Sequence, residues 1–434
     1  MTLSVLDRLL DGRLSDPDGP GTLSVSTRQV LIASGLGVYA ASLLERAGMP
    51  RDLCLVSDAN CWAAMGQKVA GRLEAAGYTL RPVIFDAPPH ADEAAVARVE
   101  AGAAGAAGLI AVGGGTVSDL AKHVAHHSAR PYAVFGTALS MNGYGSANAA
   151  ITVHGHKKSL PSTAPVAIFL DLDVLAAAPP RLARAGLGDS VCRATAQFDW
   201  LLSHLLLDRP YRQAPFALLA QDEPPLFDKA AGIGAGDRAA LAALARTLVL
   251  SGFGMVIAGS SNPASQGEHL ISHYIDMLGD PAWGESLHGE HIAVTTLTIA
   301  GLQERLLAGD APVLRPSTET RADFIHRYGE ALGASCWAEY QGKQVDAAKA
   351  QALNARLGSD WPEIRARLAA VARPRAEIDR ALQAAGAPRV PSAIHVPDAF
   401  YARAVHDARD IRDRYTILDI ARDSGLLQGA GDGR

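Results

Sequence analysis

Three histidines and one aspartate have the side-chain types expected of a metal site. His269 and His273 lie four residues apart in SQGEHLISHYID, so a helix would place both on one face. His288 lies in SLHGEH, where Gly289 allows close approach, and Asp189 lies in GLGDS among apolar neighbours. One aspartate with two histidines suits a divalent ion such as zinc or iron and leaves coordination positions for water or substrate. The alternative is a set of hydrogen-bonded core or surface histidines and a helix cap, because spacing alone cannot show that these positions converge.

A glycine-rich turn in LIAVGGGTVSDLAK is a candidate phosphate site. Leu109–Val112 is an apolar run, typical of the end of a buried parallel strand. Gly113, Gly114 and Gly115 then remove the side chains from one tight turn, and the residues that follow have a helical pattern. Bare backbone N–H groups and the positive end of a helix would meet there, which predicts a bound pyrophosphate. The alternative is a tight strand-to-helix connection without a ligand, since the spacing is neither GxGxxG nor a Walker A loop.

Polar residues follow two other predicted strands. Asp58 ends the strand LCLVSD, where an adenosine ribose often lies in parallel sheets. Its carboxylate would accept a hydrogen bond from a 2′-hydroxyl and repel a 2′-phosphate, or it would only cap the next helix. The segment after the strand AVFGT lies at the sheet edge where open α/β sheets bind ligands. Its candidate ligand-binding residues are Thr137, Ser140, Asn142 and Ser146.

Apolar strands alternate with amphipathic helices through the first part of the chain. The predicted strands are residues 30–34, 53–58, 79–86, 109–112, 133–137 and 165–175. This alternation predicts a parallel sheet with helices on both faces. Beyond Pro179 and Pro180 the apolar residues recur at three- and four-residue spacing, which is typical of helices. We therefore expect an α/β dinucleotide-binding domain over residues 1–178 and an all-α metal-binding domain over residues 179–434, with residues 1–22 as a leader or an edge helix.

The composition is that of an ordinary soluble protein. The chain has 434 residues, a formal net charge of −5 and 20% charged residues, and no basic tract favours nucleic acid. Its N-terminal segment lacks the apolar core of a signal peptide or a membrane span. The 4 cysteines show no CxxC spacing, which argues against a zinc knuckle or a disulfide framework. These features favour a cytoplasmic protein with a small-molecule partner and with neither nucleic acid nor membrane.

Several stretches follow one another in the order found in one enzyme family. They are GGGTVSDLAK, TALSMNGYGS, AGLGD, GSSNPASQGEHLISH, LHGEH and IRDRYTILDIA. This succession, over about residues 30–425, resembles the sn-glycerol-1-phosphate dehydrogenases. They belong with glycerol dehydrogenase and dehydroquinate synthase to the metal-dependent alcohol dehydrogenases. The resemblance implies a dehydroquinate synthase-like fold, with a dinucleotide-binding domain, an all-helical C-terminal domain and an active site in the cleft between them.

The resemblance also implies a role for each matching residue. The cofactor diphosphate would be bound by Gly113, Gly114, Gly115, Thr116 and Val117, with Asp119 just beyond. The nicotinamide side would be lined by Thr137, Ser140 and Ser146. The metal ligands would be Asp189, His269 and His288, and His273 would contact the substrate. We expect NAD as cofactor, with NADP possible, and zinc as the ion, with nickel or iron compatible with the same ligands.

Asn142 departs from the family pattern, which has an aspartate at this substrate-facing position. Asparagine donates and accepts hydrogen bonds but cannot ionise. The implied reaction is an NAD(P)-dependent interconversion of a small, phosphorylated polyol and its ketone, with the metal as a Lewis acid on the reacting oxygen. His273 would handle the proton or hold a neighbouring hydroxyl.

Basic residues supply candidates for binding a substrate phosphate. Arg193 lies four residues after Asp189, so a single helix would turn both to the same side. Lys157 and Lys158 close a predicted hairpin, and their alternative is a solvated surface position. Three other functions stay open: a cyclase-lyase of the dehydroquinate synthase type, a dehydrogenase of a phosphonate or unphosphorylated polyol, and a non-catalytic binding module. Relatives commonly assemble, so a homo-oligomer is expected.

Overall fold

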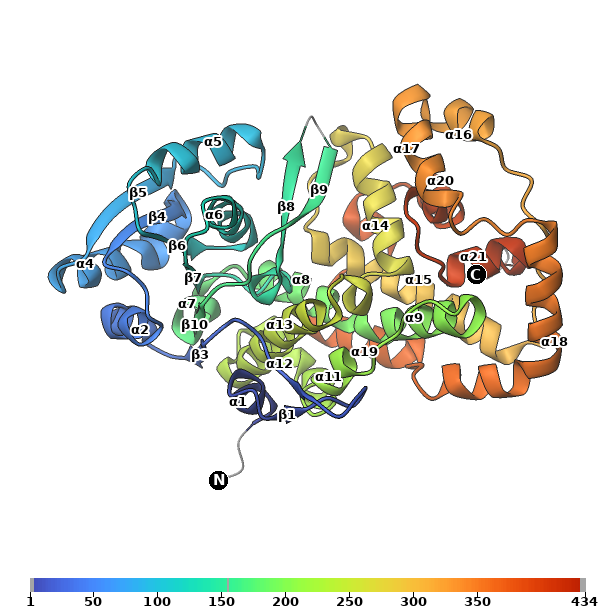
Figure 1. Cartoon of the computed structure of the whole chain (residues 1–434), viewed down its shortest axis with the longest axis horizontal. Helices are drawn as coiled ribbons and strands as arrows, with labels where there is room; N and C mark the ends of the chain where they lie inside the picture. Colours follow the sequence, from blue (N-terminus) through green and yellow to red (C-terminus); the bar gives the residue numbers. More distant parts are fainter. Residues whose placement is uncertain (1–3, 154–155, 430–434) are drawn as a thin grey trace. The chain divides into compact units, whose positions relative to one another are not determined.

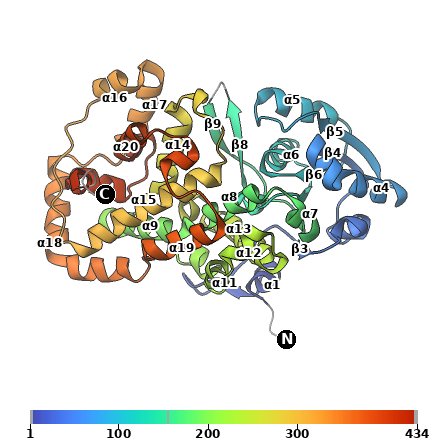
Figure 2. The same ribbon diagram turned by 180° about the vertical axis from the view of Figure 1, so that it is seen from behind.

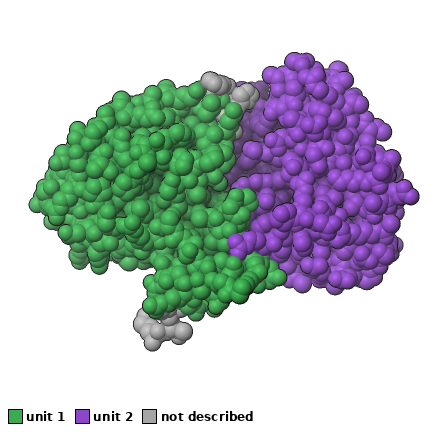
Figure 3. All heavy atoms as spheres, viewed as in Figure 1, with its two compact units in different colours: residues 1–190, 213–260, 384–387 green, residues 191–212, 261–383, 388–434 purple. Residues whose placement is uncertain are grey.

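The computed structural model describes residues 4–153 and 156–429, which form two compact units (Figure 3). Unit 1 consists of residues 1–190, 213–260 and 384–387, and unit 2 consists of residues 191–212, 261–383 and 388–434. The chain therefore passes between the units several times, whereas the sequence suggested one boundary after residue 178. The segment 213–260 belongs to unit 1 because its long helix packs against the sheet and loops of that unit.

Unit 1 is built on a six-stranded sheet in the order β3-β10-β7-β6-β4-β5 (Figure 1). In chain order the strands are β3 (Gln29–Ala33), β4 (Asp52–Asp58), β5 (Thr79–Phe85), β6 (Gly108–Gly113), β7 (Tyr132–Gly136) and β10 (Ala167–Asp171). Every neighbouring pair is parallel, with Ser57 opposite Val112 and Gly113 opposite Gly136. The parallel sheet predicted from the alternation of strands and helices is confirmed.

Helices cover both faces of this sheet, which is why its central strands are apolar throughout. One face is covered by η1 (Leu36–Tyr39), α2 (Ala40–Arg46), α3 (Ala59–Cys61), the π-turn η2 (Trp62–Gly66) and α4 (Gln67–Ala75). The other face is covered by α5 (Glu93–Gly102) and α6 (Gly115–His127). Ile110 and Val112 of β6 point into the first of these two layers, whose buried residues form one apolar cluster.

The direction of winding changes between β4 and β6. From β4 the chain crosses to β5 on one side, and from β6 it crosses to β7 on the other side. Open α/β sheets bind ligands at the carboxyl ends of the strands that flank such a switch point, because the loops diverge there and leave a crevice. Asp58 ends β4 and Gly113 ends β6. The topology therefore places two predicted cofactor residues at this edge.

Two small antiparallel ribbons stand outside the sheet. The first joins β1 (Leu14–Ser15) to β2 (Thr22–Leu23) and follows α1 (Val5–Leu10), so the edge helix expected as one alternative near the N-terminus is present. The second joins β8 (Asn148–Val153) to β9 (His156–Pro161) and confirms the predicted hairpin.

α13 (Arg238–Ala258) is a long apolar helix in the core of unit 1 (Figure 2). Its length and composition would let it cross a membrane, but 72% of its most apolar window is buried inside the structure. Its neighbours are α7 (Leu172–Ala177), α10 (Ala214–Ala217), α11 (Glu223–Asp228) and α12 (Ala230–Ala235). A helix that is apolar on all sides and packed in this way is a core helix of unit 1.

Two glycines let helices approach the backbone that follows β7. A Cβ atom on Gly252 of α13 would lie 2.7 Å from the carbonyl oxygen of Asn142. A Cβ atom on Gly186, in α8 (Pro180–Val191), would lie 1.9 Å from the carbonyl oxygen of Leu139. The loop after β7 is therefore held by direct contact of its backbone with two helices, at positions that have no room for a side chain.

Unit 2 is helical throughout its described residues and has one apolar core. Its main helices are α9 (Arg193–Leu207), α14 (Gly267–Leu278), α15 (His288–Ala308), α16 (Arg321–Tyr328), α17 (Glu330–Tyr340), α18 (Ala347–Ala369), most of α19 (Arg375–Ala385), α20 (Asp398–Asp407) and α21 (Ile417–Asp423). Short 3-10 turns connect them: η4 (Asn262–Ala264), η5 (Pro281–Trp283), η6 (Pro391–Ile394), η7 (Ala408–Ile411) and η8 (Leu426–Gly429). α14 and α15 run side by side. The predicted helical character of the C-terminal part is confirmed.

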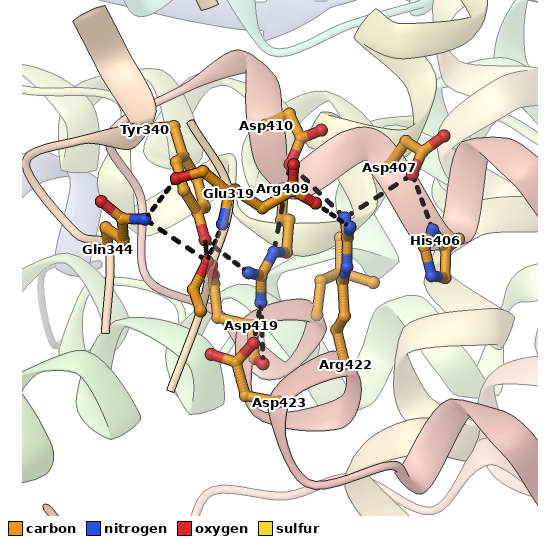
Figure 4. Close-up of polar contacts among 12 residues, drawn as sticks. Glu319, Tyr340, Gln344, His406, Asp407, Arg409, Asp410, Asp419, Arg422 and Asp423 are labelled. Atoms are coloured by element: carbon orange, nitrogen blue, oxygen red, sulfur yellow. Dashed lines mark hydrogen bonds and ion pairs between the residues drawn. The ribbon is translucent and has the colours of Figure 1, made fainter. Parts of the chain in front are cut away.

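Buried ion pairs hold the C-terminal segments of unit 2 together (Figure 4). Arg409 donates to Asp423 and to the Tyr340 hydroxyl, each at 2.6 Å. Lys343 lies 3.0 Å from Asp419, and both side chains are shielded from solvent. Removing one partner of such a pair leaves an uncompensated buried charge, which costs about 3–5 kcal/mol. These contacts tie η7 and α21 to α17 and to the turn that follows it.

The contact between α13 and the loop after β7 predicts that adding a single methyl group at Gly252 destabilises the fold. We expect Gly252→Ala to lower the free energy of unfolding by about 1–3 kcal/mol, because the new Cβ atom meets backbone atoms that cannot move away. Urea denaturation measures this change. Gly71→Ala in α4 is the matched control, since nothing lies within 4 Å of a Cβ atom there, and it should be neutral or stabilising by up to about 1 kcal/mol. Equal unfolding midpoints for the two variants would contradict the packing.

Candidate functional site

The glycine turn after β6 is tightly packed against its surroundings. The carbonyl oxygen of Gly113 accepts the backbone N–H of Thr137 at 3.1 Å. A Cβ atom on Gly113 would lie 2.6 Å from Val117 Cβ. One on Gly115 would lie 2.7 Å from Met141 Cε. Close packing against the branched Val117 side chain therefore excludes a side chain at Gly113, whereas at Gly115 the end of Met141 would have to shift.

α6 begins at this turn without a side-chain cap. Its N-cap residue, Gly114, has an extended backbone (φ −77°, ψ −167°) and contributes no side-chain acceptor. Thr116 is exposed, whereas Val117 is buried. The first N–H groups of a 13-residue helix and its positive end are thus arranged to bind an anion, as the sequence predicted for a pyrophosphate.

Asp58 caps the helix that follows β4. Its Oδ1 atom accepts the backbone N–H groups of Asn60 at 2.9 Å and Cys61 at 3.0 Å. The carboxylate is almost fully buried. The helix-cap alternative is therefore confirmed, and the ribose contact stays a prediction supported by the place of Asp58 at the switch point of the sheet.

A buried lysine links α6 to the loop after β7. Lys122 Nζ donates to the carbonyl oxygens of Gly143 at 2.7 Å and Asn148 at 3.0 Å. It also lies 3.3 Å from Asp119 Oδ1 and 3.3 Å from Ser146 Oγ. Burial lowers the pKa of Lys122, and the Asp119 carboxylate opposes that shift. Asp119 and Ser146, which the sequence predicted as cofactor residues, thus both belong to this internal network.

Other predicted cofactor residues lie around the same loop. The second oxygen of Asp119 accepts the backbone N–H of Ala150 at 3.0 Å and so ties α6 to β8. The Thr137 hydroxyl is buried 3.2 Å from Cys61 Sγ. Ser140 is half-buried further along the loop. The structure thus brings the loop and the glycine turn together, and the cofactor contacts of these residues stay predictions.

Asn142 and Asp189 are hydrogen-bonded to each other within unit 1. The backbone N–H of Asn142 donates to Asp189 Oδ2 at 2.8 Å, and its side-chain Nδ2 donates to Ser251 Oγ at 3.3 Å. Asp189 is buried on α8. The loop after β7 therefore orients a predicted metal-ligating carboxylate through a backbone amide, which any residue except proline would supply at position 142.

Two predicted metal ligands face each other within unit 2. His269 is on α14 and His288 begins α15, and their Nε2 atoms are 3.3 Å apart. Two metal–nitrogen bonds of about 2.0–2.1 Å at a tetrahedral angle hold their nitrogens about 3.4 Å apart. Without an ion, the same distance lets one ring donate to the other. The pair therefore has the spacing needed to hold a divalent ion.

Glu268 fixes the orientation of the His269 ring. Its Oε1 lies 2.9 Å from His269 Nδ1 and accepts the backbone N–H of Gln266 at 2.7 Å, and its Oε2 accepts the Thr195 hydroxyl at 3.0 Å. Burial raises the pKa of Glu268, but the hydrogen bond and charge of His269 outweigh it and lower the pKa below its ordinary value. An ionised Glu268 favours the tautomer with the proton on Nδ1, which directs the Nε2 lone pair toward His288.

His273 lies close to the histidine pair. It is half-buried on α14, with its ring centroid 6.0 Å from that of His269 and 6.2 Å from that of His288. The prediction that His269 and His273 share one face of a helix agrees with this arrangement. Three imidazoles therefore gather where α14 and α15 meet.

The basic residues predicted to bind a phosphate lie on separate elements. Arg193 is buried at the start of α9, and α8 ends at Val191, so the four-residue spacing from Asp189 spans two helices instead of one. Lys158 is exposed on β9. The side chain of Lys157 lies outside the described residues.

Sequence reasoning missed the residues that hold the candidate ligands in place. Glu268 precedes His269 directly, and an acidic residue beside a predicted ligand is a signal that could have identified it. Thr195 and Cys192 carry no such signal, because only the packing of α9 against α14 brings them near. The ligand atoms of Cys192, Glu268 and His269 lie within 4.8 Å of one another, and all three residues are buried.

Solved structures with this fold define the class of protein. Maleylacetate reductase from a Rhizobium species matches with a TM-score of 0.62 at 17% identity, over 93% of this chain and 95% of that one. Glycerol dehydrogenase from Schizosaccharomyces pombe matches with a TM-score of 0.56 at 17% identity, over 86% of this chain and 95% of that one. A family model for iron-containing alcohol dehydrogenase matches residues 31–179. The fold is therefore that of the iron-containing alcohol dehydrogenases.

Sequence relatives identify the family within this class. Glycerol-1-phosphate dehydrogenase [NAD(P)+] from Halalkalibacterium halodurans is 31% identical over 300 residues, which are 68% of this chain and 75% of the relative. The protein of the same name from Bacillus velezensis is 29% identical over 390 residues, 86% of each chain. The chain thus belongs to the glycerol-1-phosphate dehydrogenase family and is an NAD(P)-dependent alcohol dehydrogenase. The family predicted from the ordered motifs is confirmed.

Proposed function

We propose that the chain is a metal-dependent NAD(P) oxidoreductase that interconverts a small phosphorylated polyol of the glycerol 1-phosphate type and its ketone. The observation that carries this proposal is the 3.3 Å approach of two imidazole nitrogens, with a buried carboxylate holding one of the rings. Both features suit a divalent ion with positions left for a substrate oxygen. The cofactor and the phosphorylated substrate are supported by the names of the relatives.

His269 and His288 would hold the ion, and Asp189 is the proposed third ligand. The match to the ligand set of the family supports Asp189, and the backbone N–H of Asn142 already orients its carboxylate. Zinc is our proposed ion because it accepts imidazole and carboxylate ligands at an open tetrahedral site, and nickel and iron are the alternatives. When bound, the ion supplies a Lewis acid for the reacting oxygen.

The cofactor would lie along the carboxyl edge of the sheet in unit 1. The backbone N–H groups that follow Gly114 would bind the diphosphate at the start of α6. Asp58 would accept the adenosine ribose 2′-hydroxyl, which favours NAD over NADP. Thr137 and Ser140 would border the nicotinamide, on the loop that Lys122 anchors.

Substrate contacts are proposed for four residues. His273 would hold a substrate hydroxyl or handle the proton of the reacting oxygen. Asn142 would contact the same substrate through its side-chain amide. Arg193 is the stronger candidate for a phosphate because its guanidinium is buried. Lys158 is the weaker one because it is exposed.

We also propose a cytoplasmic homo-oligomer that acts on a free small molecule. All four cysteines are free thiols, which is compatible with a reducing compartment. A second candidate function, a dehydrogenase of a phosphonate or an unphosphorylated polyol, is favoured by one observation: Asn142 stands where the family has aspartate.

Loss of either histidine of the pair should remove the metal and the activity. We expect His269→Ala and His288→Ala to bind zinc at least about 100-fold more weakly, because each variant loses a direct ligand. Substitution of a residue that only orients a ligand already lowers metal affinity by about 10–100-fold. The measurements are metal content and NADH oxidation with dihydroxyacetone phosphate. His326→Ala, at an exposed histidine of unit 2, is the control and should behave as wild type. Full metal content and a near-normal rate in either variant would show that the site is wrongly assigned.

Asp58→Ser should raise the use of NADP relative to NAD. Serine can still cap α3, so the variant removes the charge and keeps the cap. The ratio of kcat/KM for the two cofactors measures the effect. Asp92→Ser is the matched control, because Asp92 caps α5 through the backbone N–H of Ala95 in the same way. An unchanged ratio for the Asp58 variant would show that Asp58 caps the helix and does not determine the cofactor preference.

The second candidate function predicts that Asn142→Asp shifts substrate preference towards glycerol 1-phosphate and lowers activity on the natural substrate. The hydrogen bond from the backbone N–H of residue 142 to Asp189 is kept in this variant, so any change in activity reports the added negative charge. A charged hydrogen bond is worth about 1.5–3 kcal/mol, which corresponds to roughly a ten- to hundredfold change in ranking. Ser251→Ala removes the partner of the amide without adding charge and serves as control. If a panel of polyols and phosphorylated ketoses ranks as for wild type, Asn142 is a neutral replacement and glycerol-1-phosphate dehydrogenase is the better assignment.

A further inference from the structure

α9 presents two buried polar side chains to the start of α14. Thr195 and Asp199 lie four residues apart, so they are neighbours on one face of the helix. Both are shielded from solvent, with exposed fractions of 1% and 0%. Neither belongs to the metal ligands or to the substrate contacts proposed above.

Asp199 accepts hydrogen bonds at both of its carboxylate oxygens. Oδ2 accepts the backbone N–H of Gly267, the first residue of α14, at 3.2 Å. Oδ1 accepts the backbone N–H of Ile417, the first residue of α21, at 3.2 Å, and the Gln303 side-chain amide at 3.0 Å. One carboxyl group thus meets the positive ends of two helices, which favour a negative charge. Burial and the nearby Glu268 carboxylate act in the opposite direction and raise the pKa of Asp199 well above its ordinary value.

Gly267 is the residue that permits this contact. A Cβ atom there would lie 2.8 Å from Asp199 Oδ2 and 2.9 Å from Ile299 Cδ1. The glycine therefore allows the carboxylate to reach the backbone immediately before the candidate metal ligand. Its place in the motif GSSNPASQGEHLISH is explained by this close approach.

Thr195 holds the next residue of α14. Its hydroxyl has two acceptors within reach, Glu268 Oε2 at 3.0 Å and the carbonyl oxygen of Cys192 at 2.8 Å. Glu268 Oε1 faces His269 Nδ1 at 2.9 Å. Gln303 of α15 donates to the carbonyl oxygen of Thr195 at 3.0 Å and so fixes this part of α9. Contacts from α9 therefore reach both residues that precede His269.

We propose that Asp199 and Thr195 are positioning residues that set the place and tautomer of the metal-binding His269 through Gly267 and Glu268. This role rests on the metal site of the proposed function. It assigns to the segment ATAQFDW, which that function does not otherwise use, the task of holding the first turn of α14.

The geometry requires a carboxylate at position 199. The N–H groups of Gly267 and Ile417 belong to the backbone and approach different oxygens. An asparagine has only one oxygen, and its NH₂ group can only donate. In either orientation of the amide, one buried backbone N–H would face another donor, and the start of α14 or of α21 would have to move.

The decisive experiment measures metal affinity in the whole protein without substrate or cofactor. We expect Asp199→Asn to bind Zn²⁺ about 10–100-fold more weakly than wild type in a chelator competition, as for other residues that orient a ligand. The visible spectrum of the Co²⁺-loaded variant should also change, because the geometry of the His269 ring changes. Asp423→Asn is the matched control: Asp423 is a buried carboxylate of the same unit, paired with Arg409 instead of α14 (Figure 4). It should lose stability and keep the wild-type zinc affinity and cobalt spectrum.

A second pair of variants decides the question if Asp199→Asn does not fold. Thr195→Val removes the hydroxyl that reaches Glu268 at nearly constant volume and should weaken Zn²⁺ binding about tenfold, whereas Thr195→Ser should restore it. Wild-type affinity in Asp199→Asn, or in Thr195→Val where the first variant is unfolded, would overturn the proposal, and so would an equal loss in Asp423→Asn. If these results overturn the role of α9 but His269→Ala still loses the ion, the proposed metal site itself stands. Full affinity in His269→Ala would overturn both.

Discussion

The candidate metal site depends on one buried contact, the 2.9 Å hydrogen bond between Glu268 and the ring of His269. A carboxylate removed from water costs several kcal/mol unless it is paired and hydrogen-bonded, so the surrounding helices must supply donors. Thr195 from α9 and the backbone N–H of Gln266 supply them. With these donors present, Glu268 stays ionised and selects the tautomer of His269 that turns Nε2 toward His288. The fold of unit 2 thus determines that Nε2 is the nitrogen that the His269 ring offers to an ion.

Unit 1 uses backbone contacts for the same purpose. The backbone of the loop after β7 contacts glycines of α8 and α13. Lys122 of α6 donates to the carbonyl oxygens of Gly143 in this loop and of Asn148 at the start of β8. These contacts place the backbone N–H of Asn142 on Asp189. The start of α6 and the loop after β7 are thus parts of one packed assembly.

This arrangement bears on the asparagine at position 142, where the family resemblance implies an aspartate. The orientation of Asp189 depends on the backbone of residue 142, and the side chain at that position is a separate variable that contacts Ser251. A change of side chain at position 142 would therefore change the charge there and keep the backbone hydrogen bond to Asp189.

The sequence by itself determined the layers of the fold, the glycine turn, the candidate histidine cluster and the family. Apolar runs, three consecutive glycines and the four-residue spacing of His269 and His273 are local patterns, and local patterns express the periodicity of strands and helices directly. Glu268 was within reach of the same reasoning because it adjoins a ligand. The strand order, the assignment of α13 to unit 1 and the contacts of Lys122, Thr195 and Asp199 were decided only by the tertiary structure. Each of these depends on which distant segments pack together, and the spacing of residues along one chain carries no information on the partner of a buried charge.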